Sequence, residues 1–181
     1  MNIPNFLTIL RITSPFFYII ICLFVDEKVD ESMYIFIIFF ILSFTDFFDG
    51  YVARKYNMVS LFGKVFDPVS DKILVCCSLF YLVSYDNNIL YPSMIIILRE
   101  FIVSGIREYS IKTRLSLLSV TFLSKLKTCL QFFSIGAFLI RDFLYTYCAI
   151  DIYQLGLIGL WITTILTLYT GFKYANKFKM N

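Results

Sequence analysis

The chain has 181 residues, of which 59% are hydrophobic and 19% aromatic, and its mean hydropathy is +0.78. An ordinary soluble domain has roughly 45–50% apolar residues, so a water-soluble fold is excluded. The formal net charge is +3, and histidine is absent. The absence of histidine excludes histidine-based acid–base catalysis, histidine metal ligation and phosphohistidine intermediates.

Apolar segments follow one another along the chain, separated by short polar breaks. With their flanks they approach the ~20 residues that an α-helix needs to cross a bilayer. The first segment starts close to the N-terminus and no small-residue cleavage site follows it, so we expect it to remain in the mature protein. We predict an all-α integral membrane protein, a single domain over residues 1–181 with six transmembrane helices at roughly 7–25, 33–53, 64–84, 88–108, 122–144 and 152–172.

Charged residues are distributed unevenly between the two ends of these predicted helices. Alternate connections place two basic and seven acidic residues on one side, and the remaining 14 basic and six acidic residues on the other. Because basic residues favour the cytoplasmic side, both termini are expected in the cytoplasm. The five cysteines lie mostly within apolar runs without C-x-x-C spacing, so neither a zinc site nor a disulfide framework is predicted.

Four aspartates lie near the predicted cytoplasmic ends of the second and third helices. In the second helix Asp46 and Asp49 are three residues apart, and Gly50 and Ala53 continue the same face. In the third helix Gly63, Asp67 and Asp71 follow at intervals of four, again on one face. Ionisable residues in a membrane segment are costly, so this arrangement predicts a functional site.

Four converging carboxylates repel one another unless they are protonated, paired with cations or neutralised by metal. All-oxygen ligation favours two Mg²⁺ or Mn²⁺ ions, which could hold a phosphoryl group between them. The small residues would leave room for a bulky anionic ligand, and Arg54 would supply a positive charge beside it. The alternative is that the aspartates are helix caps and interfacial residues, paired with Arg54, Lys55, Lys64 and Lys72.

The pattern D-x-x-D-G-x-x-A-R, eight further residues and G-x-x-x-D-x-x-x-D runs from Asp46 to Asp71, and it resembles the signature of CDP-alcohol phosphotransferases. The resemblance implies a six-helix bundle, usually a homodimer. It implies that Asp71 is the general base and that the CDP group of a CDP-linked lipid lies over the small residues, close to Arg54. The implied metal ligands are Asp46, Asp49, Asp67 and Asp71, and the implied lipid-binding residues are Gly50, Ala53, Arg54 and Gly63.

Two further stretches resemble family members that join CDP-diacylglycerol to glycerol 3-phosphate. The first is N-I-P-N-x-L-T-x-x-R, which runs from Asn2 to Arg11. The second begins at Arg99 as R-E-x-I-V-S-x-x-R-E and is followed by K-x-K-T from Lys125. A phosphorylated acceptor needs a cationic pocket, and the predicted residues are Arg99, Arg107, Lys125 and Lys127. In the alternative reading, Glu100 and Glu108 pair with the arginines, and the lysines only mark the cytoplasmic side.

The resemblance therefore predicts an enzyme of the cell (inner) membrane that forms phosphatidylglycerophosphate and CMP, with its active site on the cytoplasmic side. Its partners would be CDP-diacylglycerol, glycerol 3-phosphate and membrane lipids, and no nucleic acid is expected. A sister enzyme could instead use serine, an inositol phosphate or phosphatidylglycerol as acceptor. A small cation transporter would also place aspartates in the membrane, but neither it nor a purely structural protein explains the small residues beside them.

Overall fold

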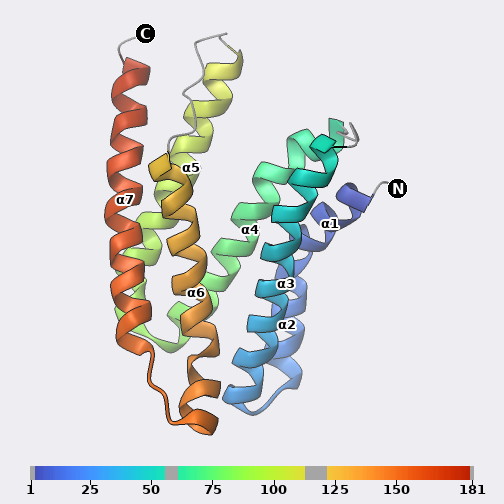
Figure 1. Cartoon of the computed structure of the whole chain (residues 1–181), viewed down its shortest axis with the longest axis vertical. Coiled ribbons are helices and arrows are strands. Elements are labelled where there is room, and N and C mark those ends of the chain that lie inside the picture. The colour runs from blue at the N-terminus through green and yellow to red at the C-terminus, as the bar shows by residue number, and fades with distance from the viewer. Residues whose placement is uncertain (1–2, 56–60, 113–121, 180–181) are drawn as a thin grey trace. The chain divides into compact units, whose positions relative to one another are not determined.

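The structure, a computed structural model, describes the backbone of residues 3–55, 61–112 and 122–179 (Figure 1), and the side chains of residues 5–45, 66–110 and 123–176. No strand occurs within these ranges, so the all-α prediction is confirmed. The elements are α1 (Ile3–Ile12), α2 (Ser14–Phe24), α3 (Lys28–Lys55), α4 (Leu61–Tyr85), a short 3₁₀-helix η1 (Asn87–Ile89), α5 (Leu90–Lys112), α6 (Phe122–Cys148) and α7 (Tyr153–Lys179).

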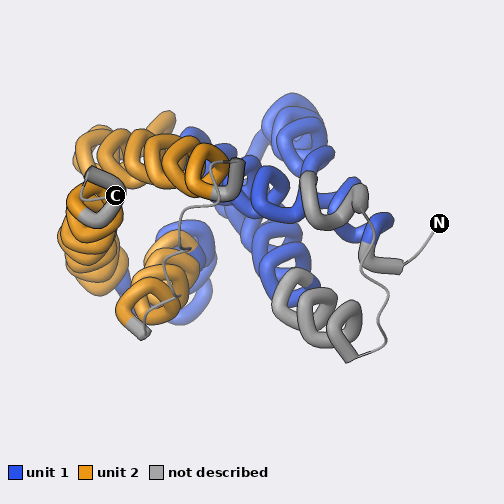
Figure 2. The backbone as a smooth tube through the Cα atoms, turned by 90° about the horizontal axis from the view of Figure 1, so that it is seen from above, with its two compact units in different colours: residues 1–82, 136–152 blue, residues 83–135, 153–181 orange. Residues whose placement is uncertain are grey.

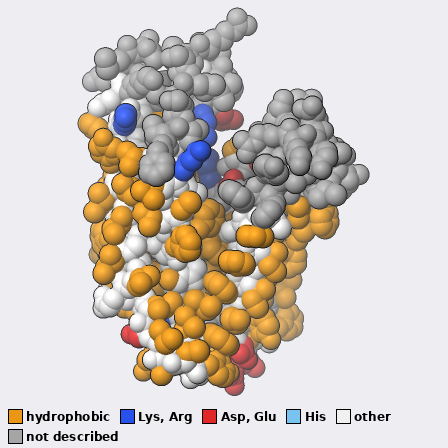
Figure 3. All heavy atoms as spheres, viewed as in Figure 1, with side chains coloured by type: hydrophobic (Ala, Val, Ile, Leu, Met, Phe, Trp, Pro, Cys, Tyr) orange, Lys and Arg blue, Asp and Glu red, His pale blue; other side chains and the backbone are white. Residues whose placement is uncertain are grey.

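Within the described residues, three helical segments are long and apolar enough to cross a membrane: Asn87–Ser110, Leu123–Cys148 and Tyr153–Asn176. The bent pair α1–α2 would make a fourth. Hydrophobic side chains cover much of the surface visible in Figure 3, as expected for helices in contact with lipid. The chain is thus a multi-pass membrane protein, while six spans are not confirmed. α3 and α4 are helical where the second and third spans were predicted.

Residues 7–25, the first predicted span, do not form one continuous helix, and the prediction was wrong in this respect. α1 and α2 meet at an angle of 44°, with Thr13 between them. Pro15 stands in the first turn of α2, where it cannot donate a backbone N–H and its ring would clash with the carbonyl of Arg11 in a continuous helix. The hydroxyl of Thr13 donates to the carbonyls of the preceding turn at 3.1 Å, which satisfies part of the end of α1.

The chain divides into two compact units, shown in different colours in Figure 2. Unit 1 comprises residues 1–82 and 136–152, and in it α1 and α2 pack against α3. α2 also contacts α4, since the hydroxyls of Tyr18 and Ser78 lie 3.0 Å apart and both side chains are buried. The contacts between α1–α2 and α4 join residues 59 or 60 positions apart, so these helices run in the same direction.

Unit 2 comprises residues 83–135 and 153–181, and in it α5 packs along α7. The amide of Asn88 donates to the Tyr153 hydroxyl at 3.0 Å near the start of both helices, and Arg99 reaches α7 further along. These two helices therefore also run in the same direction. α6 and α7 approach closely at Gly159, where a Cβ atom would lie 2.4 Å from the Ser134 Oγ. A single domain over residues 1–181 stays a prediction.

Candidate active site

Two of the four predicted carboxylates have described side chains, and both accept hydrogen bonds from α1. The Thr8 hydroxyl donates to Asp67 Oδ1 at 2.6 Å, and Arg11 Nη1 donates to Asp71 Oδ1 at 2.7 Å. Thr8 and Arg11 are each only 1% exposed, whereas the Asp71 side chain is 43% exposed. The Asp71 carboxylate is thus held by a buried cation while remaining accessible to a reactant.

The spacing along each helix explains why the two contacts form together. Thr8 and Arg11 are three residues apart on α1, and Asp67 and Asp71 are four apart on α4, so each pair lies on one helix face. Arg11 Nη1 also lies 3.5 Å from the hydroxyl of Ser70, which itself donates to the Asp67 carbonyl at 2.9 Å. A buried arginine needs such anionic and polar partners. Hydrogen bonds between polar side chains therefore connect α1 and α4.

Thr8 and Arg11 were predicted only as members of the opening pattern, without a role of their own. The signal that could have identified them is a hydroxyl and a cation one turn apart in an apolar segment, because such residues normally face the protein interior. Their partners lie 59 and 60 residues further along the chain, and local spacing cannot identify them.

The other half of the predicted site lies on α3. The backbone places Asp46 and Asp49 one helical turn apart, as expected. Their side chains and those of Ala53 and Arg54 fall outside the described residues, as do the surroundings of Gly50 and Gly63. Among the described side chains no group of three metal-ligating residues occurs, so the four-aspartate metal site stays a prediction. Asp67 and Asp71 do fit it chemically, since carboxylate oxygens suit Mg²⁺ and Mn²⁺.

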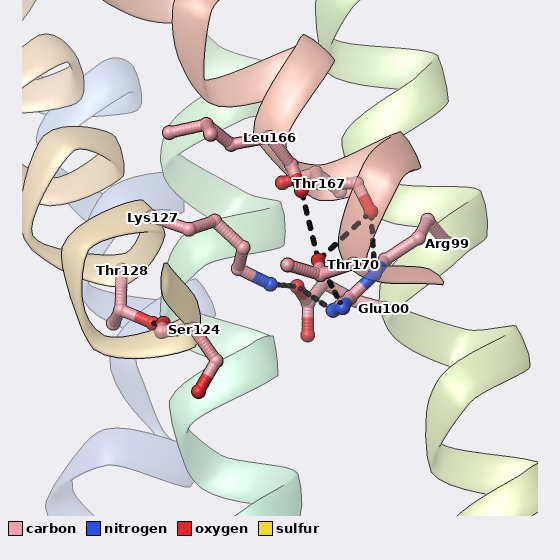
Figure 4. Close-up of polar contacts among 8 residues, drawn as sticks. All are labelled: Arg99, Glu100, Ser124, Lys127, Thr128, Leu166, Thr167 and Thr170. Atoms are coloured by element: carbon pink, nitrogen blue, oxygen red, sulfur yellow. Dashed lines mark hydrogen bonds and ion pairs between the residues drawn. The ribbon is translucent and has the colours of Figure 1, made fainter. Parts of the chain in front are cut away.

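A second polar cluster lies in unit 2 (Figure 4). Arg99 is 9% exposed and donates from Nε to the Thr167 carbonyl at 3.0 Å and from Nη2 to the Thr170 hydroxyl at 2.8 Å. Its third nitrogen, Nη1, donates to Glu100 Oε1 at 3.0 Å. Lys127 Nζ forms an ion pair with the same carboxylate oxygen. One oxygen of Glu100 is therefore shared by two buried cations.

This cluster contains two of the four residues predicted for the acceptor phosphate. Arg99 and Lys127 meet through Glu100, while the side chains of Arg107 and Lys125 are exposed. The alternative prediction that Glu100 pairs with Arg99 is confirmed. This pairing does not exclude phosphate binding, because it shows that the position between Arg99 and Lys127 accommodates an anionic group.

The apolar helices define the general class, a multi-pass membrane protein, and similarity to known proteins identifies the family. A model of the CDP-alcohol phosphatidyltransferase family matches residues 1–169, and the chain belongs to this family. Members of the family are generally dependent on a divalent metal ion.

Similar proteins from several bacteria carry the name CDP-diacylglycerol–glycerol-3-phosphate 3-phosphatidyltransferase. The protein of Rickettsia typhi (strain ATCC VR-144 / Wilmington) is 42% identical over 174 residues, which cover 96% of this chain and 94% of the relative. The Rickettsia felis protein is 40% identical, with 96% and 93% covered, and the Bacillus subtilis (strain 168) protein is 35% identical, with 97% and 94% covered.

Proposed function

We propose that the protein transfers the phosphatidyl group of CDP-diacylglycerol to glycerol 3-phosphate, giving phosphatidylglycerophosphate and CMP. The observation that carries the proposal is similarity over nearly the whole chain, at 35–42% identity, to proteins named for this reaction. The acceptor is favoured by the buried Arg99 and Lys127, which provide positive charge for a phosphate group.

In the proposed reaction, Asp71 accepts the proton of the glycerol 3-phosphate hydroxyl. The resulting oxygen attacks the lipid-bearing phosphorus in line, the bond to the CMP oxygen breaks, and CMP leaves. Arg11 stabilises the charge of Asp71 and fixes its Oδ1, while Thr8 fixes Oδ1 of Asp67. The aspartates that would hold two Mg²⁺ or Mn²⁺ ions are Asp46, Asp49, Asp67 and Asp71. Bound there, the ions would neutralise carboxylate and phosphate charge.

The remaining parts of the proposal concern the substrates and the membrane. The CDP group would lie over Gly50, Ala53 and Gly63, close to Arg54, and the acyl chains would stay in the bilayer. The acceptor phosphate would take the place of the Glu100 carboxylate between Arg99 and Lys127, with Arg107 and Lys125 at its edge. We propose a homodimer in the cell (inner) membrane, with both termini and the active site on the cytoplasmic side, as the distribution of basic residues indicates.

The test is CMP release from CDP-diacylglycerol by the purified protein in detergent with Mg²⁺. Glycerol 3-phosphate, serine, an inositol phosphate and phosphatidylglycerol are added singly. Release is expected only with glycerol 3-phosphate and should be lost in Asp71→Asn. Asp142→Asn is the control, because Asp142 lies 3.7 Å from exposed Lys28 and belongs to no predicted site.

Other outcomes would redirect the proposal. Release with a different acceptor would overturn the choice of glycerol 3-phosphate. Full activity of Asp71→Asn would overturn the assignment of the base. Absence of release with every acceptor would contradict the enzyme proposal and favour assays of cation flux across proteoliposomes.

A further inference from the structure

The C-terminal helix α7 has a surface shaped to receive Arg99, although α7 lies outside the patterns on which the predicted site was based. At Gly171, a Cβ atom would lie 3.1 Å from Arg99 Cγ and 3.3 Å from its Nε. Both distances are shorter than ordinary van der Waals contact, so the arginine stem would have to shift by a few tenths of an ångström to accommodate a side chain at this position. Glycine allows the stem to lie directly against the helix backbone.

α7 also fixes the orientation of the planar guanidinium group. Arg99 Nε and Nη2 lie on one edge of this plane, and both donate to α7, to the Thr167 carbonyl and the Thr170 hydroxyl. The Thr170 hydroxyl donates its own proton within α7, to the carbonyl of Leu166 at 2.8 Å, and it is therefore committed to accepting from Arg99.

With that edge held by α7, the remaining nitrogen Nη1 points to Glu100 Oε1, where Lys127 also donates (Figure 4). The position of this oxygen is the point at which two buried cations converge. Because the guanidinium group is planar and rigid, holding its Nε–Nη2 edge also sets the direction in which Nη1 donates to an anion. The direction is set here by residues of α7.

We propose that Thr170 and Gly171 are positioning residues for the phosphate of the acceptor: they hold Arg99 so that Nη1 is presented at the point occupied by the Glu100 carboxylate. This inference rests on the proposed function and deepens it. The ligand class is the phosphomonoester of a small polyol. Glu100 occupies the anion position when no phosphate is bound, and the geometry of Arg99 is the same in both states.

The experiment compares four variants with the wild type by steady-state CMP release, varying each substrate in turn. Gly171→Ala introduces the clashing methyl group. Gly105→Ala is its matched control, because a Cβ at Gly105 on α5 meets no atom of the described residues within 4 Å and the gain in helix propensity is common to both. Thr170→Val removes the hydroxyl with little change of shape, and Thr170→Ser retains it.

Gly171→Ala and Thr170→Val should raise KM for glycerol 3-phosphate by about tenfold, as expected when one hydrogen bond to a charged group is lost or distorted. KM for CDP-diacylglycerol should stay within about twofold of the wild type, because these substitutions weaken the binding of glycerol 3-phosphate alone. Thr170→Ser and Gly105→Ala should behave as the wild type. A general structural role would instead change both KM values and thermal stability together.

A second measurement separates this inference from the proposed function. Inorganic phosphate is titrated into each protein, and its Kd is obtained from the rise in unfolding temperature. Weaker phosphate binding by Gly171→Ala than by Gly105→Ala supports the positioning role even if the wild type does not use glycerol 3-phosphate. Equal phosphate binding by these two variants, or absence of phosphate binding by the wild type, would overturn it.

Discussion

Arg11 offers the sharpest test of how the structure holds its predicted base. It is 1% exposed, and its Nη1 donates to Asp71 Oδ1 at 2.7 Å. Breaking a fully buried ion pair by removing one partner costs about 3–5 kcal/mol. The Asp71 side chain is 43% exposed, however, and water can solvate it once the arginine is gone. The loss in Arg11→Gln should therefore be nearer to that of a charged hydrogen bond, about 1.5–3 kcal/mol.

The catalytic effect should be larger than the effect on stability. Without Arg11, the Asp71 carboxylate loses the group that fixes Oδ1, and a displaced catalytic group can lower turnover by about 10²-fold. We expect kcat for CMP release to fall by about 10- to 100-fold, with smaller changes in both KM values. Arg11→Lys should lie between Arg11→Gln and the wild type, because lysine keeps the charge but lacks the planar fork.

The assay pairs CMP release with unfolding in detergent, and Lys28→Gln is the control. Lys28 Nζ lies 3.7 Å from Asp142 Oδ2, and the two side chains are 51% and 27% exposed. A pair of this kind contributes about 0–1 kcal/mol. If Arg11→Gln loses no more stability and no more turnover than Lys28→Gln, the assignment of Arg11 as a positioning residue is refuted.

Three further predictions concern other contacts. Thr8→Val removes the hydrogen bond to Asp67, so the Mg²⁺ concentration for half-maximal CMP release should rise by about threefold to tenfold, whereas Thr8→Ser should resemble the wild type. Glu100→Gln leaves two buried cations without their shared anion, so its unfolding temperature should fall, and added phosphate should restore it more than phosphate stabilises the wild type or the control Glu108→Gln. Tyr18→Phe removes a buried hydroxyl contact to α4 and should cost about 1 kcal/mol of unfolding free energy with unchanged activity.

Local patterns predicted the helices well because both hydropathy and spacing are properties of short segments. Every predicted span coincides with a helix or a helix pair, and the aspartate positions on α3 and α4 have the expected turn spacing. The bend before Pro15 was missed, because an apolar run reads as continuous whether or not one residue lacks its backbone N–H. The number of membrane spans depends on where the membrane surface lies along each helix. Hydropathy alone cannot locate that surface in a helix whose apolar segment contains charged residues.

The pairing of Arg99 with Glu100 was predicted from local sequence, but the partners that other helices supply to the functional residues were not. Arg99 was identified as a candidate from its motif, but its partners are a backbone carbonyl and a threonine hydroxyl on α7, about 70 residues away. A carbonyl carries no residue-type signal, and a threonine in an apolar helix is usually satisfied by its own backbone, as Thr163 is. Only the packing of α5 against α7 distinguishes Thr170, which accepts a hydrogen bond from Arg99, from Thr163.

In both units, polar residues of one helix hold a charged side chain of a neighbouring helix. A charged side chain on an apolar helix has many rotamers, so a neighbouring helix is needed to set its direction. In unit 1, α1 holds the carboxylates of α4, and in unit 2, α7 holds Arg99 of α5. The two helices of each pair run in the same direction, so successive turns of one helix lie beside successive turns of the other. Substitutions in α1 and α7 should consequently separate in kinetics: Arg11→Gln should act on kcat, through the base, and Thr170→Val on KM for the acceptor, through the phosphate site.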